Sequence, residues 1–166
     1  AVLKVCEKHR LLVTVDCGIT SVELTKLAQA RGMRVVITDH HRPEGELPPC
    51  PVVNPLLNNY PFPYLCGAGV VFQLVAALGG RDAAMDYVDL AALATIADIV
   101  PLQDENRAIA ALGLKRINVS PRPGIRALID ASGMTGRVIS SGNVAFQLAP
   151  RLNASGRLGD AMRAYR

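Results

Sequence analysis

Two short apolar runs, each ending in an aspartate, constrain the fold of this chain more than any other feature of its sequence. Leu-Leu-Val-Thr-Val at 11–15 precedes Asp16, and Arg-Val-Val-Ile-Thr at 34–38 precedes Asp39. Runs of this length that are rich in β-branched residues are typical of buried strands in parallel sheets. Between them, apolar residues at helical spacing predict a helix at about 20–31. Such a strand–helix–strand unit places the carboxyl ends of both strands at one edge of a sheet.

The rest of the chain changes character after residue 42. Prolines recur from 42 to 66 and exclude regular helix there, although one short edge strand fits at 51–55. After residue 66, helical spacing interrupted by glycine and proline predicts helices at about 67–78, 83–97, 105–117, 123–131 and 140–149. We expect 150–157 to be a polar, flexible segment, and 1–10 to belong to a further helix.

These elements predict an α/β fold in which a parallel sheet is followed by a helical C-terminal portion. We interpret 1–166 as one partial domain, with a βαβ part at about 1–58 and a helical part at about 67–166. Only two or three strands are recognisable, and a stable parallel sheet normally has more. Because the chain begins with Ala1 rather than methionine, we expect a fragment whose remaining strands precede that residue.

The composition excludes several classes of protein. Hydrophobic residues make up 50% of the chain and charged residues 19%, which excludes a disordered chain. No apolar run reaches the roughly 18 residues that a membrane span needs, so no membrane is expected as a partner. The four cysteines lack the spacing of a zinc site, which indicates reduced thiols in a cytoplasmic protein. The net charge of +4, with the basic residues concentrated at 115–166, permits a polyanionic partner.

Titratable side chains follow both predicted strands directly. Asp16 follows the first, and Asp39, His40 and His41 follow the second, so we expect the two groups to converge at one edge of the sheet. Carboxylate and imidazole together suit Mn²⁺, Zn²⁺ or Fe²⁺, and carboxylates also suit Mg²⁺. Two simpler interpretations stay open: Asp16 caps the next helix, and the Asp-His-His run forms a solvated turn.

Further candidates lie in the helical portion. Asp98 is the only charged residue in the apolar stretch 91–101, and a buried carboxylate there needs a partner or a metal ion. At the end of a helix it is also disfavoured by the helix dipole, unless it simply bonds nearby backbone. Arg151, Asn153 and Arg157 in the polar segment could contact phosphate oxygens, or form an ordinary basic loop. Cys66-Gly67-Ala68-Gly69 opens a helix, where packing and turn geometry explain the glycines better than anion binding does.

Six stretches, in this order, resemble motifs of the DHH phosphoesterase superfamily, and of its RecJ-like single-stranded-DNA exonuclease branch in particular. They are Val15-Asp16-Cys17-Gly18-Ile19-Thr20, Asp39-His40-His41, Leu65-Cys66-Gly67-Ala68-Gly69, Ala97-Asp98-Ile99-Val100-Pro101-Leu102, Asp104-Glu105-Asn106-Arg107 and the stretch from Pro150 to Leu158. The resemblance covers essentially the whole chain. It implies a DHH domain built from Rossmann-like βαβ units.

The resemblance also implies a function and a role for each candidate residue. The expected activity is phosphodiester hydrolysis of single-stranded DNA from its 5′ end with two Mn²⁺ or Mg²⁺ ions, in company with DNA-repair proteins. The metal ligands would be Asp16, His40 and Asp98. Asp39 would orient that ligand set, and His41 would act at the scissile phosphate. The residues near the substrate phosphate would be Arg151, Asn153 and Arg157.

The chain departs from the family pattern in one respect that bears on activity. The family's first motif, Asp-x-Asp, does not occur, and three ligands are too few for two metal ions. We therefore expect residues upstream of the chain to complete the site, and the chain alone to be inactive. The alternatives are a DHH enzyme for short oligonucleotides, cyclic dinucleotides or pyrophosphate, and a non-catalytic nucleic-acid-binding module.

Overall fold

The fold is centred on a three-stranded parallel sheet, as the sequence predicts. The computed structural model describes residues 8–157, so the helix expected at 1–10 lies largely outside the described residues. The strands are β1 (Leu11–Val15), β2 (Arg34–Thr38) and β3 (Val52–Val53), in the order β1-β2-β3. β3 falls inside the stretch predicted as an edge strand. The helix α2 (Val22–Ala30) connects β1 to β2 and follows an N-cap at Ser21.

The two faces of the sheet differ in burial. On one face, Val35 and Ile37 of β2 are buried with Ala28 and Met33 from α2 and the turn after it. On the other, Leu11, Val13 and Val15 of β1 are each about half exposed. The strands expected before residue 1 concern sequence outside this chain, and they stay a prediction.

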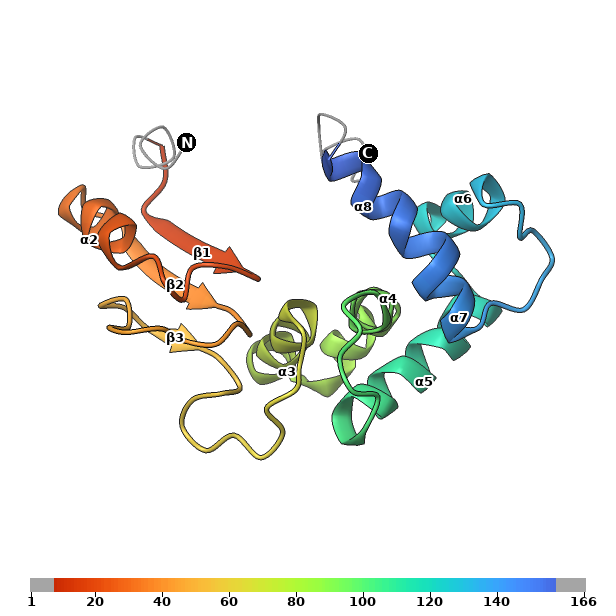
Figure 1. The fold of residues 1–166 in the computed structure, drawn as a ribbon, viewed down its shortest axis with the longest axis horizontal. Helices are drawn as coiled ribbons and strands as arrows, with labels where there is room; N and C mark the ends of the chain where they lie inside the picture. The colour runs from red at the N-terminus through yellow and green to blue at the C-terminus, as the bar shows by residue number, and fades with distance from the viewer. Residues whose placement is uncertain (1–7, 158–166) are drawn as a thin grey trace.

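Helices predominate after the proline-rich loop that follows β2 (Figure 1). They are α3 (Gly67–Met85), α4 (Val88–Ala97), α5 (Asp104–Val119), α6 (Pro123–Ala131), α7 (Ser141–Asn143), a π-helical turn η1 (Val144–Leu148) and α8 (Ala149–Arg157). Figure 1 shows the sheet and α2 at one end of an elongated molecule, with α3 and α4 in the middle. The arrowheads of the strands point toward α3, so the carboxyl edge of the sheet faces the helical part.

Two predicted boundaries differ from the structure. The helix predicted at 67–78 continues past Gly80, where α3 kinks at a φ of 85°. The boundary between α3 and α4 lies at residues 86–87 instead of before residue 83. The segment 150–157, predicted to be flexible, is helical. A proline inside a helix lacks a donor and clashes with the carbonyl four residues earlier. Here the wider π turn before Pro150, in which Ala149 N–H donates to Val144 O, changes that geometry and lets the helix continue.

Two contacts position α4 against its neighbours, in addition to the buried apolar core that these helices share. α4 and α5 pack tightly at Gly113, where a Cβ atom would lie 2.5 Å from Val88 O and would overlap Ala92. Asp89 of α4 is fully buried and accepts hydrogen bonds from Arg122 Nε at 2.8 and 3.0 Å. That ion pair fixes the start of α6 against α4.

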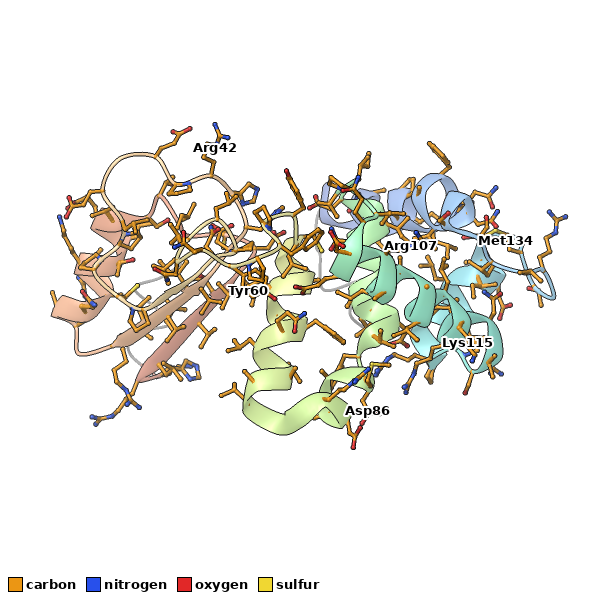
Figure 2. All side chains as sticks on the ribbon, turned by 90° about the horizontal axis from the view of Figure 1, so that it is seen from below. Arg42, Tyr60, Asp86, Arg107, Lys115 and Met134 are labelled. Carbon is orange, nitrogen blue, oxygen red and sulfur yellow. The ribbon has the colours of Figure 1, made fainter. Side chains whose placement is uncertain are left out.

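The proline-rich loop is tied to the start of α5. The Asn106 side chain is fully buried and donates to Tyr64 O at 2.7 Å and Pro101 O at 3.0 Å. Glu105 accepts a 3.0 Å hydrogen bond from Tyr60 Oη, and Figure 2 shows Tyr60 where this loop meets the helices. The polar run 104–107 therefore joins the loop before α3 to the loop after α4.

The close approach at Gly113 predicts a large effect of one added methyl group. Gly113→Ala should lower the free energy of unfolding by about 1–3 kcal/mol, because the new carbon must displace α4 backbone. Urea denaturation followed by circular dichroism measures this. Gly124→Ala in α6, where a Cβ meets open space, is the matched control and should not destabilise the fold. A Gly113→Ala variant as stable as the control would contradict this packing.

A second prediction concerns the tie at Tyr60. Burial, followed by the hydrogen bond to Glu105 and its charge, raises the pKa of Tyr60 to about 12. Above the usual tyrosine pKa of about 10, the unfolded chain loses this proton while the folded chain keeps it. The free energy of unfolding should therefore fall as the pH rises from about 10 towards 12. Tyr60→Phe should remove this part of the slope in urea titrations, and an unchanged slope would contradict the tie.

Candidate metal centre

Asp16 and the run Asp39-His40-His41 converge at the carboxyl edge of the sheet, as the strand pattern predicts. The Asp16 N–H donates to Thr38 O at 3.0 Å, which extends the pairing of β1 with β2 by one residue. Asp16 then adopts a φ of 62°, a left-handed conformation that turns the chain out of the sheet. The interpretation of Asp16 as a helix cap is not supported, because Ser21 occupies the N-cap of α2.

His40 lies between two carboxylates that come from different parts of the chain. Its Nε2 is 3.1 Å from Asp16 Oδ1 after β1 and 3.6 Å from Asp98 Oδ2 at the end of α4. The His40 side chain is only 16% exposed, whereas those of Asp16 and Asp98 are 59% and 45% exposed. The apolar neighbours of Asp98 led us to expect a buried carboxylate, and that expectation is wrong. Asp98 is the C-cap of α4, where the chain turns out of the apolar layer.

Asp39 is the most enclosed carboxylate of the site, at 1% exposure. Its Oδ2 accepts the Ile19 N–H at 2.9 Å, and its Oδ1 accepts the N–H groups of His40 and His41 at 2.8 and 3.1 Å. Burial by itself raises the pKa of Asp39, but these hydrogen bonds and that of the His41 ring outweigh it and lower the pKa. A charged Asp39 thereby fixes the backbone of both histidines.

His41 is the more exposed of the two histidines, at 60% of its side chain. Its Nδ1 lies 2.7 Å from Asp39 Oδ1. That hydrogen bond raises the pKa of His41, burial opposes it, and the charges of Asp39, Asp16 and Asp98 add to the rise. With Nδ1 engaged, Nε2 is the ring nitrogen that can meet a ligand or substrate.

The donor set fits a divalent metal ion. One ligand atom each from Asp16, His40 and His41 lies within 4.8 Å of the others. Asp98 lies beside this group of three rather than in it, with its Oδ2 3.6 Å from His40 Nε2. Nitrogen and oxygen ligands in such a combination suit Mn²⁺, and the carboxylates also suit Mg²⁺. The described residues at this edge of the sheet can therefore bind a divalent ion without large movement of their side chains.

A cavity of about 340 Å³ adjoins this cluster. Its lining includes Asp16, Asp98 and Asn153, so the sheet edge, α4 and α8 share it. Of the three residues expected near a substrate phosphate, Asn153 is thus brought to the site. Arg151 instead donates to Gln147 O at 2.7 Å on the exposed side of α8, and the Arg157 side chain lies outside the described residues.

Sequence reasoning missed two contacts at this site. The Ile19 N–H bonds to Asp39, and a backbone donor of this kind leaves no mark on residue identity. Gly67 at the start of α3 lies against the Asp16 side chain. The sequence shows a glycine at this position, but only the structure shows that the Asp16 side chain fills the space beside it.

A comparison with protein families places the chain. The family described as "DHH family, N-terminal domain" matches residues 1–96. The chain belongs to the DHH family. This confirms the resemblance drawn from the motifs, and the α/β fold with its parallel sheet is that of solved relatives in this family.

Similar proteins carry the name "single-stranded-DNA-specific exonuclease RecJ". The one from Bacillus subtilis (strain 168) is 48% identical over 154 residues, which are 91% of this chain and 20% of the relative. The one from Thermus thermophilus is 45% identical over 164 residues, which are 96% of this chain and 24% of the relative. This DHH chain therefore spans about a fifth to a quarter of the length of these two relatives.

Solved structures agree with this placement. An exonuclease RecJ bound to manganese superposes with a TM-score of 0.88 at 43% identity, covering 98% of this chain and 42% of that chain. RecJ from Thermus thermophilus in complex with Mg²⁺ gives a TM-score of 0.71 at 40% identity, covering 93% and 22%. No helix among the described residues of this chain is long and apolar enough to cross a membrane.

The buried position of Asp39 predicts a pH-dependent contribution to stability. Asp39→Asn should lower the free energy of unfolding by about 2 kcal/mol at neutral pH, because hydrogen bonds to a charged acceptor are lost. Since the pKa of Asp39 is lowered in the folded state, its contribution is present above the usual aspartate pKa and is lost as the pH falls through the folded value.

Urea denaturation of the metal-free protein at neutral and acid pH measures this difference. The gap between wild type and Asp39→Asn should narrow in acid. Asp86→Asn, an exposed carboxylate beyond α3, is the matched control and should show little gap at either pH. A gap for Asp39→Asn that does not depend on pH would contradict a charged Asp39.

Proposed function

We propose that this chain supplies the metal-binding and phosphate-facing part of a DHH exonuclease that hydrolyses single-stranded DNA, using Mn²⁺ or Mg²⁺. The observation that carries the proposal is the position of His40 Nε2, 3.1 Å from Asp16 and 3.6 Å from Asp98. Three residues from three separate elements meet at the sheet edge where parallel folds place their ligands. The substrate class rests on the names of the relatives.

In this proposal Asp16, His40 and Asp98 hold the metal. A divalent cation bound there supplies Lewis acidity and neutralises charge on the scissile phosphate. The carboxylates of Asp16 and Asp98 are about half exposed, so each keeps an oxygen accessible from the cavity. The site is completed by residues outside this chain, and the chain alone is inactive in this account.

In this proposal His41 acts on the reacting phosphate, and Asp39 orients His41. The hydrogen bond to Asp39 orients the His41 ring and favours its protonated form. A proton held on Nε2 can then be donated to a phosphate oxygen or to the departing sugar oxygen. Asp39 acts through the ring rather than on the substrate, because protein donors occupy both of its oxygens.

The substrate enters beside α8. Asn153 lines the cavity, and its side-chain amide can donate to a phosphate oxygen. Arg151 and Arg157 lie on the same helix and would contact phosphates further along the strand. The family resemblance adds three further parts to this proposal. Hydrolysis starts from the 5′ end of the strand, DNA-repair proteins are partners, and residues 1–166 form one partial DHH domain.

Substitution of the metal ligands tests the proposal. In the complete polypeptide that contains these residues, Asp16→Asn and Asp98→Asn should each lower Mn²⁺-dependent release of nucleotides from single-stranded DNA by at least about 100-fold. That corresponds to about 2.7 kcal/mol of transition-state stabilisation. Elemental analysis should show reduced manganese content in both variants.

Asp86→Asn is the control for these substitutions, because Asp86 lies at the surface beyond α3 (Figure 2). Its side chain is exposed and pairs only loosely with Arg116, at 3.8 Å. It should keep wild-type activity and metal content. Full activity in Asp98→Asn would contradict the proposed ligand set. Rapid hydrolysis of dinucleotides with none of long single strands would replace the proposed substrate with short oligonucleotides.

A further inference from the structure

Gly67, the first residue of α3, is a glycine that its own backbone does not require. Its φ lies outside the left-handed range in which glycine is favoured, so an L-residue could adopt this conformation. Alanine stabilises a helix more than glycine does. The residue is also buried. Something other than chain geometry must therefore account for the missing side chain.

The space that a side chain at Gly67 would need is filled by Asp16. A Cβ atom built on Gly67 would lie 2.5 Å from Asp16 Cγ and 2.6 Å from Asp16 Cβ, and would overlap Asp16 Oδ1. Rotation of the aspartate cannot relieve this overlap, because the position of Asp16 Cβ is set by the backbone. Ordinary carbon contacts begin at about 3.5 Å, so the two segments would have to separate by about 1 Å.

Neither segment can separate freely. The Asp16 N–H is bonded to Thr38 O at 3.0 Å, which holds Asp16 to the end of β2. On the other side, the Cys66 sulfur accepts the Gly69 N–H at 3.3 Å and lies 3.5 Å from the hydroxyl of Thr95. Thr95 is fully buried in α4, three residues before Asp98. The first turn of α3 is thus fixed between the sheet edge and α4.

We propose that Gly67 is a positioning residue for the metal site, whose lack of a side chain lets Asp16 and α4 approach closely enough for Asp16 and Asp98 to meet His40. This deepens the proposed function and rests on it for the metal. A separation of about 1 Å would move Asp16 out of reach of a shared ion, and misplacement on that scale costs about 100-fold where geometry matters.

A double-mutant cycle tests the contact without any metal. In metal-free buffer, Gly67→Ala should lower the melting temperature by roughly 4 °C or more. Asp16→Gly removes every Asp16 atom that the new Cβ would meet, and glycine tolerates the positive φ at that position. In the Asp16→Gly background, Gly67→Ala should therefore be neutral or raise the melting temperature. An equal loss in both backgrounds would overturn the inference.

Binding of Mn²⁺ tests the consequence for the site. Titration of the complete polypeptide with Mn²⁺, followed by the electron paramagnetic resonance signal of the free ion, should show at least about 10-fold weaker binding in Gly67→Ala. Gly124→Ala, a first-turn glycine of α6 with open space beside it, is the matched control and should bind as wild type.

The two experiments separate failure of the inference from failure of the proposed function. Wild-type affinity in Gly67→Ala would overturn the positioning role, even though the ligands themselves are correct. Absence of Mn²⁺ binding in the wild type would overturn the proposed function. The double-mutant cycle of melting temperatures would still decide whether Gly67 and Asp16 are coupled. If Gly67→Ala alone does not fold, recovery of folding in the Asp16→Gly double variant supports the inference, and no recovery contradicts it.

Discussion

The buried carboxylate of Asp39 is the constraint on which the rest of the site depends. A charge at 1% exposure is tolerated only when protein donors surround it. Three backbone N–H groups and the His41 ring do so, and they come from the turn after β1 and from the end of β2. The carboxylate thereby joins two neighbouring strand ends and sets the direction of both histidines. Its hydrogen bonds hold the backbone of both histidines and the ring of His41.

The candidate metal centre depends on contact between the helical part and the sheet. Asp98 reaches His40 because α4 ends there, and two contacts hold that end in place. Cys66 links the first turn of α3 to Thr95 of α4, and Asn106 ties the loop after Asp98 to the loop before α3. The candidate site is therefore a product of tertiary packing across two layers, with one proposed ligand from each of three elements. Packing of α4 against the edge of the three described strands thus brings these proposed ligands together.

Local pattern was enough to predict β1, β2, α2 and the convergence of Asp16 with the histidines, because strand ends in a parallel sheet share an edge. It was not enough where distant residues decide. The helix at 150–157 depends on a π turn that relieves Pro150, and the exposure of Asp98 depends on where α4 ends. The basic residues of the C-terminal third looked like a surface for a polyanion, yet Arg122 is bonded to the buried Asp89.

We propose that Asp16, His40 and Asp98 together form one metal-binding site. A crystal structure with Mn²⁺, using the anomalous signal of the ion, tests it most directly. We expect an anomalous peak within about 2.5 Å of His40 Nε2 and of an oxygen from each aspartate. If two manganese ions bind side by side, these three ligand atoms should be divided between the two peaks. A manganese peak that leaves Asp98 or His40 without contact would contradict the account.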